Sequence, residues 1–167
     1  GFDGKEKGEG IYYTDACVIR PQLQYIIFEG GNPPYTTTIS QYYITLLKYI
    51  LHKHFSTISH YSIDRIKLNL GLQTSKGTKY LVPHKDHTVL NHLSMTLFIG
   101  ESDGEHLVFK ETDNHLREKQ STPLTPIEQY AHKNNRLVYN TGQYHCNYDP
   151  VEYAFRLALN FVVTFAV

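Results

Sequence analysis

One segment near the start of the chain has the hydrophobic period of a helix. In residues 38–55, TISQYYITLLKYILHKHF, apolar side chains recur every three to four positions, and Thr38 is a residue type that caps helices. Two earlier segments, 11–20 and 23–30, are rich in β-branched and aromatic residues and predict strands. The glycines and prolines of GGNPPYTT then interrupt the chain before the helix.

After residue 62 the pattern becomes that of β-structure. Short apolar or alternating segments are separated by turn signals such as Asp103-Gly104 and Asp149-Pro150. The polar stretch 112–134 predicts a long loop that acts as a lid or carries binding residues. A helix followed by closely spaced strands favours a mainly β fold, a sandwich or jelly roll supported by an N-terminal helix. The strands predicted here are 63–72, 79–84, 92–100, 105–111, 135–140, 143–147 and 152–167.

Length and composition limit the possible functions. The 167 residues suit a single domain (1–167), with N-terminal strands and helix in 1–62 and a β core in 63–167. Sixteen basic and sixteen acidic residues cancel, so strong nonspecific binding of nucleic acid is not expected. No apolar run approaches the ~18 residues of a membrane span. Two cysteines, Cys17 and Cys146, are too few for a disulfide scaffold and predict reduced thiols.

The segment VPHKDH, residues 82–87, raises the possibility of a metal site. In a strand, His84 and Asp86 would point to the same side. Two histidines and one carboxylate on one face hold iron(II) in many oxygenases, so this pair would supply two of three ligands. A His-x-Asp pair also arises by chance in a chain with ten histidines, so a solvated polar loop is the alternative at this point.

The C-terminal third supplies further candidates in NRLVYNTGQYHCNYDPVEYAFRLALNF. His145 lies on a short predicted strand after a Thr-Gly turn, and Arg156 begins the last strand among apolar neighbours. An arginine there is rarely buried without an anionic partner, and its guanidinium matches a carboxylate in bidentate fashion. The partner could be a dicarboxylate ligand. An ion pair with Glu152, or a side chain that reaches the surface, would also explain it.

Polar residues also alternate along two predicted strands. In RIKLNL, Arg65, Lys67 and Asn69 share one face, and the apolar residues share the other. Such a face either lines a wet pocket or contacts solvent. Asn160 shares a face of the last strand with Arg156 and is a second pocket candidate.

The other histidines are not predicted to bind metal. His87 alternates with Asp86, so it is expected at the pocket rim or on the surface. Cys146 should face away from His145, as a thiol in the core. The histidines expected at the surface or in loops are His106, His115 and His132.

The order of these motifs resembles that of the iron(II)/2-oxoglutarate-dependent oxygenases, in their prolyl-hydroxylase-like branch. The order is Pro-His-x-Asp, an apolar strand, an Asp-Gly-Glu hairpin, an Asn-Arg-Leu-Val segment, a histidine, and an arginine eleven residues later. The chain is also similar to small oxygenases of this type encoded by marine bacteriophages. The resemblance covers residues 63–167 and implies a double-stranded β-helix, or jelly roll.

The resemblance implies a role for each matching residue. The residues that match the iron(II) ligands are His84, Asp86 and His145. Arg156 matches the residue that binds the far carboxylate of 2-oxoglutarate. The family often has an aromatic residue three positions before the first histidine; this chain has Leu81 there, preceded by Tyr80. The further residues assigned to cofactor binding are Asn69, Tyr80 and Asn160.

The implied activity is that of a dioxygenase. It would consume 2-oxoglutarate and O2, release succinate and CO2, and hydroxylate a substrate, with a peptidyl residue such as proline favoured over a small metabolite or a nucleobase. No protein general base is required. The cytoplasm of a bacterial host, with a phage-infected host as one case, is the expected location. A non-catalytic jelly-roll binding or structural module is the alternative, and a cupin-like metal enzyme would not need Arg156.

Overall fold

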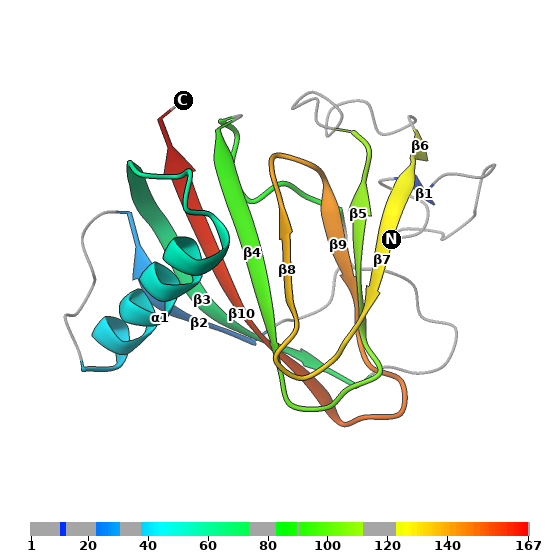
Figure 1. Cartoon of the computed structure of the whole chain (residues 1–167). Coiled ribbons are helices and arrows are strands. Elements are labelled where there is room, and N and C mark those ends of the chain that lie inside the picture. Colours follow the sequence, from blue (N-terminus) through cyan, green and yellow to red (C-terminus); the bar gives the residue numbers. More distant parts are fainter. Residues whose placement is uncertain are drawn as a thin grey trace.

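The computed structural model describes residues 11–12, 23–30, 38–73, 83–89, 91–111 and 123–166. Within these ranges the chain forms one helix and ten strands, and the two main sheets face each other in a jelly-roll arrangement (Figure 1). The predicted mainly β fold with an N-terminal helix is therefore confirmed. No helix in the described ranges is both long enough and apolar enough to cross a membrane.

The larger sheet has five antiparallel strands in the order β2-β3-β10-β4-β8. Its centre is β10, which pairs with β3 on one side and with β4 on the other. The register places Arg156 opposite Gly71, and it places Asn160 between Lys67 and Thr96. The bounds of these strands are β2 Leu23–Glu29, β3 Tyr61–Leu72, β4 His92–Ile99, β8 Leu137–Asn140 and β10 Phe155–Phe165.

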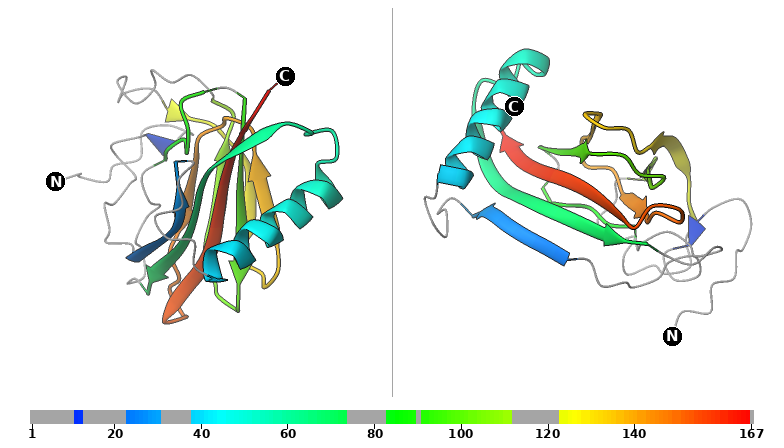
Figure 2. Two further views of the ribbon diagram at one scale, coloured as in Figure 1. Left: turned by 90° about the vertical axis from the view of Figure 1, so that its left-hand side faces the viewer. Right: turned by 90° about the horizontal axis from the view of Figure 1, so that it is seen from below.

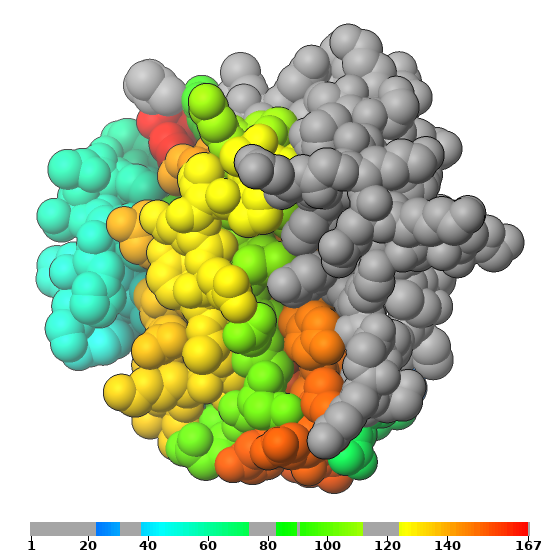
Figure 3. Space-filling view, turned by 90° about the vertical axis from the view of Figure 1, so that its right-hand side faces the viewer, coloured from blue at the N-terminus to red at the C-terminus, as the bar shows by residue number. Residues whose placement is uncertain are grey.

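The smaller sheet has three strands in the order β7-β5-β9, and a two-stranded ribbon, β1-β6, accompanies it. The prediction of a loop throughout 112–134 is wrong, because β6 and β7 lie within that range. Five of the six residues of β7 are exposed, so this edge strand lacks the apolar alternation that reveals a strand (Figure 3, yellow). The bounds are β1 Ile11–Tyr12, β5 Glu105–Phe109, β6 Pro123–Leu124, β7 Pro126–Ala131 and β9 His145–Tyr148.

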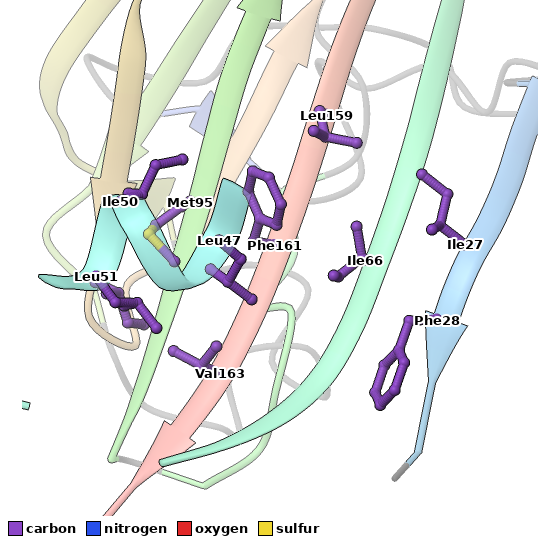
Figure 4. Packing of buried hydrophobic residues seen from close by; sticks show 11 residues of the cluster. Ile27, Phe28, Leu47, Ile50, Leu51, Ile66, Met95, Leu159, Phe161 and Val163 are labelled. Carbon is purple, nitrogen blue, oxygen red and sulfur yellow. The ribbon is translucent and has the colours of Figure 1, made fainter. Parts of the chain in front are cut away.

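Helix α1, Thr38–His54, packs against one face of the larger sheet (Figure 2). Its buried apolar residues Leu47, Ile50 and Leu51 lie over side chains of β4 and β10 (Figure 4). Ile39, which shares the helical period, is 56% exposed because it lies in the first turn and outside this contact. The full buried cluster is Ile27, Phe28, Leu47, Ile50, Leu51, Ile66, Leu93, Met95, Leu159, Phe161 and Val163.

This packing determines which face of the larger sheet is polar. Alternate residues of β10, Leu159 and Phe161 among them, belong to the core beneath α1. The residues between them, including Arg156 and Asn160, line a cavity together with residues of β3 and β9. The two sheets therefore enclose polar side chains at this position, which is costly unless those side chains have a partner or a ligand.

Candidate metal centre and anion pocket

Three side chains from distant parts of the sequence converge at one point. One potential ligand atom from each of His84, Asp86 and His145 lies within 4.8 Å of the other two. Nε2 of His145 is 3.3 Å from Oδ2 of Asp86, and Nε2 of His84 is 4.0 Å from Oδ1. The convergence depends on the backbone, since the amides of His84 and His145 each donate to the other residue's carbonyl at 2.9 Å.

The three side chains differ in exposure. The side chain of His84 is 40% exposed, whereas those of Asp86 and His145 are 2% and 4% exposed. A metal at this point would have two buried ligands, Asp86 and His145, and solvent or substrate would reach it past the more exposed His84. This donor set, two imidazoles and one carboxylate, is the one that binds non-haem iron(II) with open positions.

The Asp86 carboxylate is held in place by several donors. Arg65 donates to Oδ1, Ser94 Oγ donates to Oδ2, and Asn160 Nδ2 lies 3.3 Å from Oδ2. Burial acts to raise the pKa of Asp86, but the nearby histidines and Arg65 outweigh it and hold that pKa well below its usual range. The group is therefore ionised at neutral pH, as a metal ligand must be.

The side chain of Asn140 lies against Nδ1 of His145. Its side-chain amide lies 3.4 Å from Nδ1 of the imidazole, while its Oδ1 is buried without a hydrogen-bond donor in the described part of the chain. Rotating the amide by 180° places Oδ1 against Nδ1–H and supplies that missing donor. Nε2, which faces Asp86, then keeps its lone pair for a metal.

Arg156 is buried at another end of the same cavity, with 1% of its surface exposed. Nη1 donates to Asn147 Oδ1 at 3.2 Å, and Nη2 lies 3.9 Å from Asp149 Oδ1. Burial lowers its pKa and Asp149 opposes that shift. Its Nε finds no acceptor among the described residues. The protein partner is thus Asp149 rather than Glu152, and the side chain does not reach the surface.

Two glycines make room for this arginine. A Cβ on Gly104 would lie 2.6 Å from Cδ of Arg156 and 2.8 Å from the carbonyl oxygen of Tyr148. A Cβ on Gly71 would collide with Oδ1 of Asp149. Neither glycine has a positive φ, so space is the reason for glycine at both positions.

The cavity between the triad and Arg156 has a volume of about 240 Å³. It is smaller than the ~300–1,000 Å³ of most ligand sites, so it suits a small acid rather than a large group. Asn69 and Asn160 both line it. Tyr80 lies outside the described residues. The lining residues are Gln24, Lys67, Asn69, His84, Asp86, Thr96, His145, Asn147, Arg156, Ala158 and Asn160.

The prediction that His106 lies at the surface or in a loop is wrong, because it is buried within β5. His106 is 1% exposed, and burial lowers its pKa to about 3. His132 lies in the loop after β7, as the prediction allowed, but it is only 7% exposed and stacks on Phe98 at 4.7 Å between ring centroids. His106 shares a face of β5 with the apolar Val108, and this could have revealed its burial. Cys146 is buried as predicted, and His115 lies outside the described residues.

The residues of the site fit an iron(II) ion together with a small dicarboxylate. The triad supplies the nitrogen and carboxylate donors, and Arg156 has a donor without a protein acceptor. No carboxylate from the described residues closes an ion pair within hydrogen-bonding distance of that guanidinium, since Asp149 is 3.9 Å away. The cavity joins the two groups.

No family model and no curated protein matches the chain. Solved structures do match. A 2OG-Fe(II) oxygenase-family oxidoreductase from Burkholderia pseudomallei superposes with a TM-score of 0.59 at 18% identity, over 86% of this chain and 66% of that one. The protein has the 2OG-Fe(II) oxygenase fold.

Two further proteins with this fold are named for different reactions, a hydroxylation and an epimerisation. The viral collagen prolyl hydroxylase of Paramecium Bursaria Chlorella virus-1, solved with 2OG, matches with a TM-score of 0.50 at 9% identity, over 88% of this chain and 80% of that one. The alpha-ketoglutarate-dependent epimerase SnoN of nogalamycin biosynthesis matches with a TM-score of 0.51 at 10% identity, over 86% of this chain and 61% of that one. The 2OG-Fe(II) oxygenase fold thus supports more than one outcome, and the site decides which.

Proposed function

We propose that the protein is an iron(II)- and 2-oxoglutarate-dependent dioxygenase. One observation carries the proposal: a cavity that contains the converging His84, Asp86 and His145 also contains the buried guanidinium of Arg156. A binding module has no physical reason to gather these four groups around one small space, because the three that are buried, Asp86, His145 and Arg156, are costly to bury without a ligand.

The proposal gives each group a role. His84, Asp86 and His145 hold the iron, and Arg156 pairs with the far carboxylate of 2-oxoglutarate. Asn69, Asn160 and Tyr80 are proposed as further cosubstrate contacts. When bound, iron(II) and 2-oxoglutarate would enable O2 to hydroxylate a C–H bond of the substrate, and succinate and CO2 would be released beside the hydroxylated product.

The protein contributes position and the exclusion of water. Arg156 and Asn160 are four residues apart on β10, about 13 Å along a strand, and Asn160 contacts Asp86. Ala158 lies between them with only a methyl group, which leaves the cavity open along the strand. Arg156 therefore fixes where an acid can bind relative to the triad, and the sheets shield that position from solvent.

Hydroxylation of a peptidyl residue such as proline is the favoured reaction. The half-exposed side of the site at His84 offers an approach for a side chain that projects from a larger molecule. The cavity itself is too small for a bulky substrate beside a dicarboxylate. The same fold in a prolyl hydroxylase is compatible with this choice.

Anaerobic absorption spectroscopy tests the proposal. We expect wild-type protein with iron(II) and 2-oxoglutarate to develop the visible charge-transfer band of a chelated 2-oxo acid. His145→Ala should abolish the band, Arg156→Gln should raise the 2-oxoglutarate concentration it requires, and the exposed His54→Ala should change neither. If folded wild-type protein gives no band, the proposal is wrong. The Arg65–Asp86 contact is then a structural ion pair, and the protein is a non-catalytic jelly-roll module.

A further inference from the structure

His106 lies behind the proposed metal centre. It belongs to β5 and pairs directly with Asn147 of β9, two residue pairs away from the pair that contains His145. Its ring stacks on that of His145, with centroids 5.3 Å apart and planes inclined by 25°. The ring of His84 also contacts that of His145, with centroids 4.6 Å apart and planes inclined by 55°. The imidazole of His145 thus contacts two other rings.

The same histidine also reaches the arginine at the far end of the cavity. Nδ1 of His106 lies 2.9 Å from Oδ1 of Asn147, and Nη1 of Arg156 donates to that oxygen at 3.2 Å. An arginine can only donate, so the shared atom must be the amide oxygen. Nδ1 of His106 therefore carries a proton, and both N–H groups converge on one acceptor.

We propose that His106 is a positioning residue that couples the metal ligand His145 to the carboxylate anchor Arg156. The inference rests on the proposed function and adds a residue to it. The face of the ring limits the orientations of His145, and its N–H, acting through Asn147, limits those of the guanidinium. A buried aliphatic side chain would fill the same space and do neither.

Two substitutions separate these effects. His106→Phe keeps a ring of similar shape but removes the N–H that orders Asn147. His106→Asn keeps an N–H close to the position of Nδ1 but removes the ring that stacks on His145. His132→Phe is the matched control, because that buried imidazole stacks on Phe98 and bonds to the carbonyl of Gly100 without contacting the triad.

The measurements are made on purified protein without turnover. Calorimetry gives the affinity for manganese(II), and titration of the metal-loaded protein gives the affinities for 2-oxoglutarate and for 2-oxopentanoate, which has a methyl group in place of the far carboxylate. His106→Phe should lose about tenfold in preference for 2-oxoglutarate over 2-oxopentanoate, with manganese affinity nearly unchanged. His106→Asn should bind manganese about tenfold more weakly and keep the preference.

A merely structural role gives a different result. Both variants would then resemble His132→Phe, with a lower melting temperature and an unchanged preference between the two acids, and the inference would be overturned. If His106→Phe does not fold, Asn147→Ala removes the same acceptor and should show the same selective loss. The wild-type titration is independent of this comparison: absence of manganese or 2-oxoglutarate binding there would refute the proposed function itself, and the inference with it.

Discussion

Arg65 donates a hydrogen bond to Oδ1 of Asp86, so the carboxylate proposed as an iron ligand also forms an ion pair within the protein. The side chain of Asp86 is 2% exposed and that of Arg65 is 23% exposed. A buried carboxylate without a counter-charge is strongly unfavourable. The guanidinium therefore stabilises the fold when no metal is bound, and a metal ion would share that task.

Arg65→Met should accordingly destabilise the metal-free protein more than the metal-loaded protein. We expect the free energy of unfolding in urea to fall by about 2–3 kcal/mol in the presence of a chelator, less than for a fully buried pair because Arg65 is partly exposed. Manganese(II) should recover most of the difference, since the ion neutralises Asp86. Equal losses with and without metal would show that Arg65 does not act through this carboxylate. Lys133→Met, at an exposed position, is the control.

Asn140→Leu should weaken metal binding without preventing folding. The substitution removes the amide that we expect to accept from Nδ1–H of His145, so the ring would lose its fixed orientation and part of its basicity. Partners of this kind are worth about 10–100-fold in metal affinity. Calorimetry with manganese(II) measures the effect. An affinity equal to that of wild type would mean that Asn140 serves only the packing of β8.

Gly104→Ala should displace Arg156. The new methyl group would overlap Cδ of the arginine and the carbonyl oxygen of Tyr148, and we expect a loss of about 1–3 kcal/mol in stability. Because the triad lies elsewhere in the cavity, affinity for 2-oxoglutarate should fall more than affinity for manganese(II). Parallel losses in both affinities would contradict this division of the site.

Asp103 should make stability depend on pH in the acid range. Burial acts to raise the pKa of Asp103, but backbone N–H groups of Val151, Glu152 and Tyr153 outweigh it and lower that pKa. A carboxyl group with a lowered folded pKa stabilises the protein above its unfolded pKa of about 4, and this contribution disappears as pH falls through the folded value.

The pH profile of Asp103→Asn tests this. The variant should be less stable than wild type by about 1–2 kcal/mol at pH 7, and the two stability curves should converge as the pH falls below 4. Urea unfolding at several pH values measures the difference. A difference that stays constant into acid would indicate that the amide loses packing rather than charge-assisted hydrogen bonds.

The proposed ligands could be located in the sequence because each lies in a pattern with a simple geometric meaning. His84 and Asp86 are two positions apart, Arg156 stands among apolar residues, and a period of two assigns Asn69 and Asn160 to polar faces. These signals are local, whereas the complete triad with His145, and the double-stranded β-helix, are implied by the resemblance of the motif order to the iron(II)/2-oxoglutarate-dependent oxygenases.

The supporting residues could not be found in this way. The contact of Asn147 with both His106 and Arg156 depends on the register between β5 and β9, which no short segment encodes. The burial of His132, in the loop after β7, likewise depends on Phe98 of β4. β7 was missed because an exposed edge strand has a loop-like composition. Local pattern thus predicts which face a residue occupies, and pairing between strands decides its neighbours.

The position of β10 between β3 and β4 has a consequence for biosynthesis. A nascent chain that has reached residue 154 already contains all three proposed metal ligands, yet β2-β3 and β4-β8 would be separate pairs with no strand to join them. Asn160, which holds Asp86, and Arg156 would also be absent. We therefore expect Asp86 to lack this contact on the ribosome until the strand has emerged. We expect incomplete chains to be cleared by proteases without capturing iron, so that metal loading reports a completed fold.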